Sequence, residues 1–269
     1  MSRHRVATLD ECLVSLVAPH SYEAEQYRGL RHLVEQAHRT SALSVLAVSS
    51  ASVGDGKTTT AINLAGALAQ ASDARVLLMD VDLRRPAIAE RLGVEEGRHG
   101  LVDAILSHDL KLADVARPCG PLNLAVVTAG VFSDIPYELL RSPRLGDLLE
   151  QARRDYDYVV LDTPPLVPIP DARVISKWVD SFLLVVRANT TPRSLLEESL
   201  NLMDPPKVLG LVFNNDERPR TTYNDYYAGS GRHDKGGAPT WWRPFAKIRS
   251  VFDPDAAGRR RPERRREIR

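Results

Sequence analysis

The chain has 269 residues, of which 43% are hydrophobic, and its 36 Lys and Arg against 35 Asp and Glu leave a net charge of +1. This length allows one large domain with appendages, and the hydrophobic fraction suffices for a sizeable core. The two cysteines, Cys12 and Cys119, lie in no CxxC or Cys/His spacing, which excludes a disulfide framework and a zinc site and fits a reducing cytosol. No apolar segment resembles a secretory signal or reaches the ~18–20 residues of a membrane span, so we expect a cytoplasmic protein.

The first predicted element is a charged helix near the N-terminus. Residues 23–33, EAEQYRGLRHL, place Glu25, Arg28 and Arg31 at three-residue intervals. Side chains three apart are neighbours on a helix surface, so these charges fall on one face. By itself the pattern is typical of a solvated face stabilised by such pairs.

The most informative segment follows at residues 49–60, SSASVGDGKTTT. The apolar run before it predicts a buried strand, and TTTAINLAGALAQA after it predicts a helix with apolar residues at three-to-four spacing. A strand, a Gly-containing turn and a helix start are the context of a phosphate-binding loop, here A-x-x-x-x-G-K-T with Ala51 at the usual first glycine. The alternative is a Gly-rich turn without a ligand.

In a phosphate-binding loop, successive backbone N–H groups wrap the phosphates of a nucleotide, with the helix N-terminus behind them. Lys57 would reach the β- and γ-phosphates, and Thr58 would offer its hydroxyl to Mg²⁺. The sequence therefore predicts a site for ATP and Mg²⁺ formed by Gly54, Asp55, Gly56, Lys57, Thr58 and Thr59.

Two acidic strand ends come next. Residues 75–86, RVLLMDVDLRRP, deliver Asp80 and Asp82 at or just beyond the end of an apolar strand, where open α/β sheets bind ligands. Two carboxylates two residues apart on an extended chain point the same way, so one can hold Mg²⁺ while the other faces the attacking group. Residues 156–165, YDYVVLDTPP, end their strand at Asp162, a second Mg²⁺ anchor. The alternatives are solvated charges for the first pair and a loop cap for Asp162.

Strand-like runs alternate with helical patterns, at residues 44–50, 75–80, 122–127, 157–162, 181–187 and 208–213. Such alternation predicts a mostly parallel sheet with helices on both faces. Together with the phosphate-binding loop, this alternation predicts an α/β P-loop NTPase fold. The expected parts are an N-terminal segment, a P-loop domain and a flexible basic tail, at residues 1–40, 41–216 and 217–269.

The C-terminal tail, residues 217–269, holds 14 Lys and Arg against 7 Asp and Glu. Disorder, an anionic lipid surface or nucleic acid could each explain such a basic arm. Within it, residues 241–252 place Trp241, Phe245 and Ile248 on one helical face. Basic residues lie off that face, which is typical of a helix in a membrane interface. Docking of the same aromatic side chains on the P-loop domain is an equal alternative.

The order of these motifs resembles that of the bacterial tyrosine kinases, the BY-kinase family of capsule and exopolysaccharide systems. That family pairs its P-loop with an extra D-x-D motif on the next strand, which LLMDVDLRRP matches, and the likeness covers roughly residues 20–227. The related ParA/MinD ATPases carry a lysine early in the loop, where this chain has Ser52. Two features depart from the family: the C-terminal tyrosine cluster is thin, and residues 228–269 match no family segment.

The resemblance implies transfer of the γ-phosphoryl group of ATP to a tyrosine hydroxyl, with Lys57, Asp80 and Asp82 as catalytic residues. Asp82 is the preferred acceptor of the tyrosine proton, and Asp80 is the other candidate. Thr58, Asp80 and Asp162 would organise Mg²⁺. By family pattern Asn214 would contact the adenine; the alternative is a plain strand-end turn residue.

The resemblance also implies partners. The charged helix would join subunits into a ring, so that the tail of one subunit reaches the site of its neighbour. Other expected partners are a separate transmembrane polysaccharide co-polymerase adaptor, which would place the chain at the inner face of the plasma membrane, and a tyrosine phosphatase. Nucleic acid is not expected. The residues implied are Tyr223, Tyr226 and Tyr227 as phosphate acceptors and Glu25, Arg28 and Arg31 for assembly.

The competing hypothesis is an ATP-binding switch without kinase activity, which would act as a scaffold for a membrane polysaccharide machine. Such a protein keeps the nucleotide motifs but has no need of tail tyrosines. A weaker alternative is a DNA-partitioning ATPase that would use the basic tail on DNA.

Overall fold

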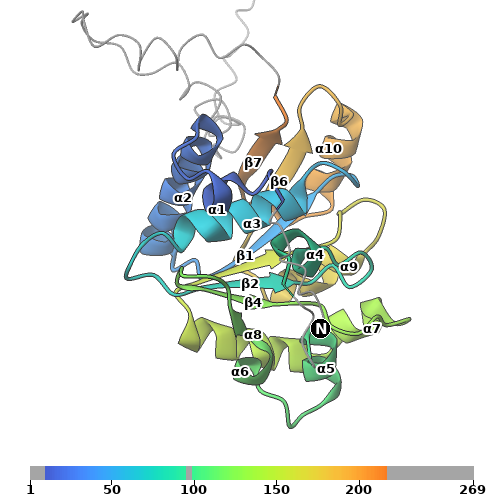
Figure 1. Cartoon of the computed structure of the whole chain (residues 1–269). Coiled ribbons are helices and arrows are strands. Elements are labelled where there is room, and N and C mark those ends of the chain that lie inside the picture. Colours follow the sequence, from blue (N-terminus) through green and yellow to red (C-terminus); the bar gives the residue numbers. More distant parts are fainter. Residues whose placement is uncertain (1–9, 95–98, 217–269) are drawn as a thin grey trace, which may run out of the picture. The chain divides into compact units, whose positions relative to one another are not determined.

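A computed structural model describes residues 10–94 and 99–216 (Figure 1). Its centre is a seven-stranded sheet in the order β3-β4-β2-β5-β1-β6-β7. All pairings between the described strands are parallel except that of β3 with β4. The strands are β1 (Val45–Ser50), β2 (Val76–Asp80), β3 (Arg117–Pro118), β4 (Leu124–Val127), β5 (Tyr158–Asp162), β6 (Ser181–Arg187) and β7 (Val208–Asn214).

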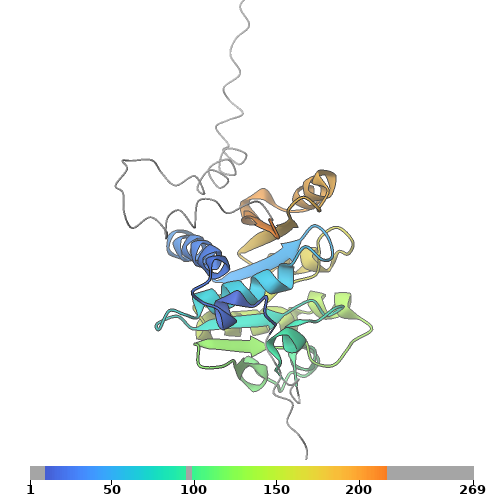
Figure 2. The same cartoon turned by 45° about the horizontal axis from the view of Figure 1, so that its top comes forward.

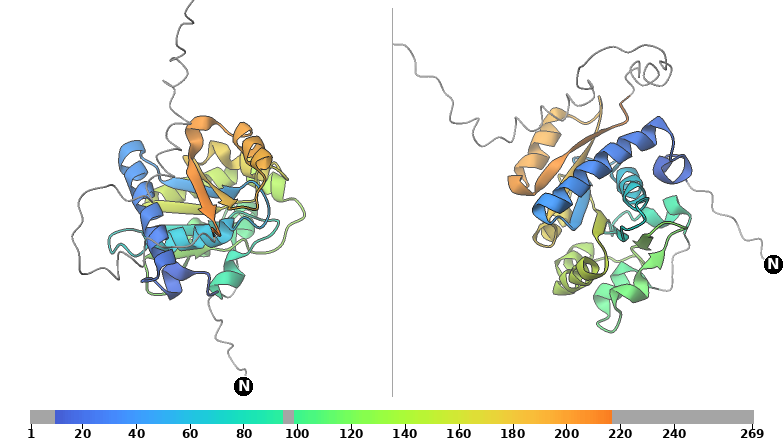
Figure 3. Two further views of the ribbon diagram at one scale, coloured as in Figure 1. Left: turned by 90° about the horizontal axis from the view of Figure 1, so that it is seen from above. Right: turned by 90° about the vertical axis from the view of Figure 1, so that its left-hand side faces the viewer.

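Helices connect the strands and cover both faces of the sheet. Helices α2 and α3 lie over one face of the sheet and α8 lies over the other (Figure 1, Figure 2 and Figure 3). In the described ranges no helix has the length and apolarity needed to cross a bilayer. The helices are α1 (Val14–Val17), α2 (Tyr22–Ser41), α3 (Lys57–Leu68), α4 (Ile88–Leu92), α5 (Leu101–Leu106), α6 (Leu112–Val115), α7 (Pro136–Arg141), α8 (Pro143–Asp155), α9 (Asp171–Val174) and α10 (Arg193–Asn201), with 3₁₀ turns at Ile175–Lys177 and Pro205–Lys207.

Alternate strand residues point into two hydrophobic cores, one on each face of the sheet. On β1, Val45 and Ala47 join a core with residues of α5, α6 and α8, whereas Leu46 and Val48 join a core with residues of α2 and α3. Strands buried on both faces need apolar residues at every position, which explains the continuous apolar runs in the sequence. The predicted α/β fold, mostly parallel with helices on both faces, is confirmed.

The six predicted strands are all present, each within two residues of its expected ends. The sequence analysis missed β3, an exposed two-residue edge strand that ends in Pro118. A pair of this kind has no hydrophobic period to detect, and proline in a sheet is confined to such edges.

Helix α2 packs directly on α3. It begins after Ser21, whose hydroxyl accepts the N–H of Ala24 as an N-cap. Ala24 and Val34 are buried, and Val34 shares a core with the residues of α3. Arg31 Nη1 also donates to the carbonyl oxygen of Ala67 on α3, at 3.1 Å. The charged helix is thus attached to the helix that follows the phosphate-binding loop.

Asp180 connects the start of β1 to α8 through hydrogen bonds. Its Oδ2 accepts the N–H groups of Ser44 and Val45 at 2.9 and 2.8 Å, and both carboxylate oxygens accept from the guanidinium of Arg153. Burial tends to raise the pKa of Asp180, but the bonds from Arg153, Val45 and Ser44 outweigh burial, so its pKa lies below the usual value. Because the folded pKa is depressed, the stabilisation is present above the unfolded pKa of about 4 and is lost as pH falls through the folded pKa.

We therefore expect Asp180→Ala to lower the free energy of unfolding by about 2 kcal/mol at pH 7, the scale of hydrogen bonds to a partly exposed charge. Urea unfolding at pH 7 and at about pH 3 measures the effect, and the difference from the parent should shrink at the lower pH. Asp73→Ala, at an exposed carboxylate, is the control and should change little. An equal loss at both pH values would contradict the assigned charge interaction.

Candidate active site

The turn between β1 and α3 has the backbone of a phosphate-binding loop. Gly54 and Gly56 have φ angles of 89° and 95°, a region that residues with a Cβ rarely adopt. Gly56 is the N-cap of α3, and a Cβ there would also collide with the side-chain amide of Asn214. Because Gly56 has no side chain to cap the helix, the first N–H groups of α3 remain available for an anion.

Lys57 lies at the centre of the site. Its Nζ is 2.7 Å from Asp82 Oδ2 and 3.4 Å from Asp162 Oδ1. Burial by itself would lower the pKa of Lys57, but the charges of Asp162 and Asp82 outweigh burial and raise it. The ammonium group is therefore charged, and two carboxylates hold it. An incoming phosphate would have to compete with them for the lysine.

Asp80 and Asp162 lie side by side, because they are register partners at the ends of the adjacent strands β2 and β5. Both are buried. Asp80 Oδ2 accepts the N–H groups of Ala87 and Ile88, each at 3.0 Å. Burial, together with the charge of Asp162, raises the pKa of Asp80 to about 7. Burial also raises the pKa of Asp162, although the charge of Lys57 opposes it. The positive charge near these two carboxylates is therefore too small to offset both of their negative charges.

Two oxygens of this pair fit a Mg²⁺ site. Asp80 Oδ1 and Asp162 Oδ2 are buried and have no hydrogen-bond partner in the described part of the chain, and Thr58 is buried beside Lys57. In the same ranges no group of three His, Cys, Asp or Glu residues could hold a metal alone. These observations agree, because Mg²⁺ at phosphate sites takes one or two carboxylates and fills its other positions with water and phosphate oxygens.

Asp82 differs from Asp80 in its contacts. Its Oδ1 accepts the N–H of Arg85 at 3.1 Å, and its Oδ2 pairs with Lys57. When a phosphate takes Lys57, Asp82 Oδ2 is left without its partner and becomes available to another group. Asp80 keeps its two amide bonds regardless. This difference favours Asp82 over Asp80 as the acceptor of a proton.

An ion pair that the sequence analysis missed joins the loops that follow β2 and β5. Arg84 donates through Nε and Nη2 to the two oxygens of Asp171, at 2.6 and 3.2 Å, and Asp171 is fully buried. The bidentate pair ties the segment after Asp82 to α9. Nothing in the sequence motif LRRP indicates that Arg84 has a partner 87 positions away, so only the fold reveals this ion pair.

The remaining predicted nucleotide residues lie around the loop. The hydroxyl of Thr59 accepts from Arg91 Nη1 at 3.0 Å. Asn214 Nδ2 donates to the carbonyl oxygen of Asp55 at 3.0 Å, so its amide supports the loop. The loop brings together Gly54, Asp55, Gly56, Lys57 and Thr58 with Asp80, Asp82, Asp162 and Asn214.

The predicted assembly residues lie on α2, outside this site. Arg28 pairs with Glu25 and also donates to the carbonyl of Pro19, at 2.5 Å, and Arg31 pairs with Glu35 at 2.6 Å. Both arginines thus have partners within their own chain. The predicted acceptors Tyr223, Tyr226 and Tyr227, the amphipathic segment 241–252 and the rest of the tail, 217–269, lie outside the described residues.

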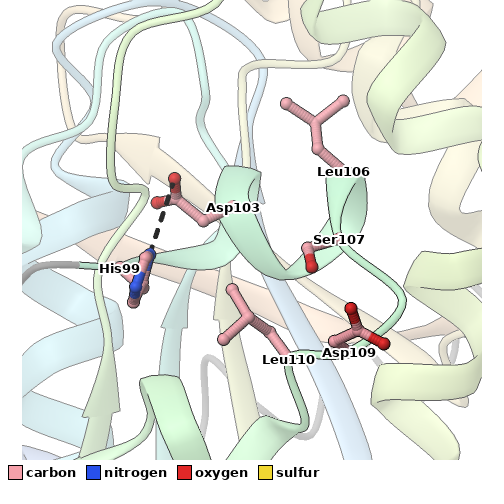
Figure 4. A pocket seen from close by; sticks show the side chains of 6 residues that line it. All are labelled: His99, Asp103, Leu106, Ser107, Asp109 and Leu110. Carbon is pink, nitrogen blue, oxygen red and sulfur yellow. Dashed lines mark ion pairs between the residues drawn. The ribbon is translucent and has the colours of Figure 1, made fainter.

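A separate pocket lies beside α5 and contains none of the predicted site residues (Figure 4). His99 Nδ1 is 4.0 Å from Asp103 Oδ1 at one end, and the side chain of Leu106 is exposed. The lining residues are His99, Asp103, Leu106, Ser107, Asp109 and Leu110.

Known proteins resemble this chain in sequence and in fold. A family model described as an AAA domain matches residues 43–191. The tyrosine-protein kinase CpsD of Streptococcus agalactiae is 31% identical to this chain, over 71% of the chain and 83% of CpsD. The chain belongs to the bacterial tyrosine-protein kinases. Membership of this P-loop family implies that the chain binds a nucleotide.

Other bacterial tyrosine-protein kinases are also similar to this chain. The tyrosine-protein kinase YwqD of Bacillus subtilis is 28% identical, over 84% of this chain and 95% of YwqD. Wzc of Salmonella typhi is 33% identical over 80% of the chain, but the chain spans only 30% of Wzc. The solved kinase domain of the Escherichia coli tyrosine kinase ETK has a TM-score of 0.73 at 28% identity and covers 87% of the chain and 88% of that domain.

Proposed function

We propose that this chain is an ATP-dependent protein-tyrosine autokinase that acts in capsule or exopolysaccharide synthesis and export. The observation that supports it most is the cluster at the ends of β1, β2 and β5. There the P-loop lysine Lys57, with 13% of its side chain exposed, lies between Asp82 and Asp162, and two carboxylate oxygens lack partners within the described ranges. The Mg²⁺ that accompanies a bound nucleoside triphosphate would supply the missing partner of these oxygens.

In this proposal the N–H groups of residues 54–58 and Lys57 bind the phosphates, and Thr58, Asp80 and Asp162 hold Mg²⁺. The ion would neutralise charge on the phosphate oxygens. The tyrosine oxygen forms a bond to the γ-phosphorus, the bond from that phosphorus to the bridging oxygen breaks, and ADP leaves. Asp82 accepts the hydroxyl proton. Since the transition state is loose, positioning and charge stabilisation do most of the catalytic work.

We propose that the phosphate acceptors are Tyr223, Tyr226 and Tyr227 of a neighbouring copy in a homo-oligomeric ring. A tyrosine phosphatase would reset them. We also propose that a transmembrane polysaccharide co-polymerase works with the chain at the inner face of the plasma membrane, because one relative, 34% identical over 78% of this chain, is the succinoglycan biosynthesis transport protein ExoP. The amphipathic segment 241–252 would add a contact with the membrane surface.

The function is tested by intact mass of the purified chain with and without ATP and Mg²⁺. A kinase adds steps of about 80 mass units, one for each phosphate. ATP binding without any mass step would contradict the proposal and favour the alternative, a nucleotide switch without kinase activity.

The assembly part of the proposal makes its own prediction. Replacing Glu25, Arg28 and Arg31 together by Ala should give a monomer that binds ADP but phosphorylates itself about 100-fold more slowly at micromolar concentration, because assembly supplies the effective concentration of tail and site. Light scattering and the initial rate of phosphotyrosine formation measure both effects. Arg39→Ala, exposed on the same helix, is the control. If the triple variant has the same mass as the parent, these residues do not assemble the ring.

A further inference from the structure

Asp55 places a buried carboxylate inside a loop that is built to bind anions. Its side chain is 3% exposed. A negative charge beside phosphates would oppose their binding unless hydrogen-bond donors hold the carboxylate in place and stabilise its charge. The contacts of Asp55 show which groups do so.

Both oxygens of the carboxylate are bonded to neutral donors. Oδ2 accepts the N–H of Ser52 at 3.0 Å, within the loop itself. Oδ1 accepts the hydroxyl of Thr191 at 2.7 Å, from the segment that follows β6. The main-chain oxygen of Asp55 accepts from Asn214 Nδ2 at the end of β7. The loop is therefore anchored to two strands on one side of the sheet.

The hydroxyl of Thr191 is itself fixed. Its Oγ1 accepts the N–H of Arg187 at 3.0 Å while its proton goes to Asp55. The N–H of Thr191 donates to the carbonyl of Arg187 at 3.0 Å, and the N–H of Ala188 donates to the carbonyl of Asn214 at 2.8 Å. These bonds close the turn after β6 and join it to β7. Thr191 is thus held in one orientation by its own turn.

We infer that Thr191 is a positioning residue for nucleotide binding, and that it acts through Asp55. By binding Oδ1 it keeps the carboxylate turned toward the sheet, with Oδ2 on the N–H of Ser52. The loop then holds the shape that leaves its remaining N–H groups for phosphate before any ligand arrives. A loop that is already ordered spares the ligand the cost of ordering it. This inference rests on the proposed nucleotide-binding function.

Thr191→Val removes the hydroxyl and keeps the branched shape, so it isolates the hydrogen bond. We expect the dissociation constant for ADP with Mg²⁺, measured by titration calorimetry, to rise about tenfold, the scale of one hydrogen bond to a charged group. Thr191→Ser restores the donor and should bind ADP within about twofold of the parent. Thr190→Val removes a hydroxyl from the exposed neighbouring threonine and should match the parent.

A double-mutant cycle with Asp55→Ala then separates positioning from general weakening of the fold. If Thr191 acts through Asp55, Thr191→Val should add no further loss of ADP affinity in the Asp55→Ala background. The inference is overturned if Thr191→Val binds ADP as tightly as the parent, or if it costs the same tenfold without Asp55. ADP binding does not require kinase activity, so an absence of phosphotyrosine would reject the proposed function and leave this result standing.

Discussion

Replacing Lys57 by Met should reduce phosphotyrosine formation by on the order of 1,000-fold, the scale seen when one preorganised donor to a developing charge is removed. Lys57 is the cation that Asp82 and Asp162 share, and we expect it to move to the phosphates when a nucleotide binds. Its loss removes charge from the transition state and also weakens ADP binding.

Quantitative phosphotyrosine assays and ADP titration measure these two effects on Lys57→Met. Lys111→Met, at an exposed lysine, is the matched control and should behave as the parent. The melting temperature of each variant shows whether the loss reflects unfolding. Autophosphorylation at the parental rate in a folded Lys57→Met chain would reject the assignment of the P-loop.

Asp82→Asn should lower the turnover number by about 100-fold or more, the usual range for a general base, with little loss of affinity for ATP·Mg²⁺. A group that acts on the acceptor hydroxyl matters mainly in the transition state, so kcat falls while binding is kept.

Asp162→Asn is the informative comparison for Asp82→Asn. It should raise the Mg²⁺ concentration needed for half-maximal activity, because one of the unpartnered oxygens of the proposed metal site is lost. Steady-state kinetics over a range of Mg²⁺ concentrations distinguishes the two variants. Full turnover in Asp82→Asn would move the proton-accepting role to Asp80 or remove it.

The sequence was sufficient for the parts of the fold that repeat a simple period. Strands such as β1 and β5 are buried on both faces, and such strands can be recognised in the sequence as short apolar runs. The phosphate-binding loop was equally visible, because its backbone geometry demands glycine at positions such as Gly54 and Gly56. Asp80 and Asp162 were predicted at strand ends, and the parallel register places them side by side.

What could not be predicted depends on contacts between distant segments. Arg84 lies within hydrogen-bonding distance of Asp171 only because β2 and β5 are neighbours in the sheet. Thr191 reaches Asp55 across 136 positions for the same kind of reason. Lone threonines and arginines are ordinary surface residues in most sequences, so nothing local marks them as supports of a site. The ion pair between Lys57 and Asp82 was also not predicted, because the motifs describe how these residues contact a nucleotide and not how they contact each other.

The proposed transfer of phosphate between subunits is tested most directly by mixing two variants, neither of which should gain phosphate when incubated alone. One is Lys57→Met, which keeps its tail tyrosines, and the other replaces Tyr223, Tyr226 and Tyr227 by Phe, which keeps its catalytic site. After incubation with ATP and Mg²⁺, mass spectrometry of the separated chains locates the phosphate. The account predicts phosphate on the three tail tyrosines of the Lys57→Met chain and none on either variant incubated alone. Phosphotyrosine on the Phe-substituted chain, at Tyr22 or Tyr27 for example, or no transfer in the mixture, would contradict it.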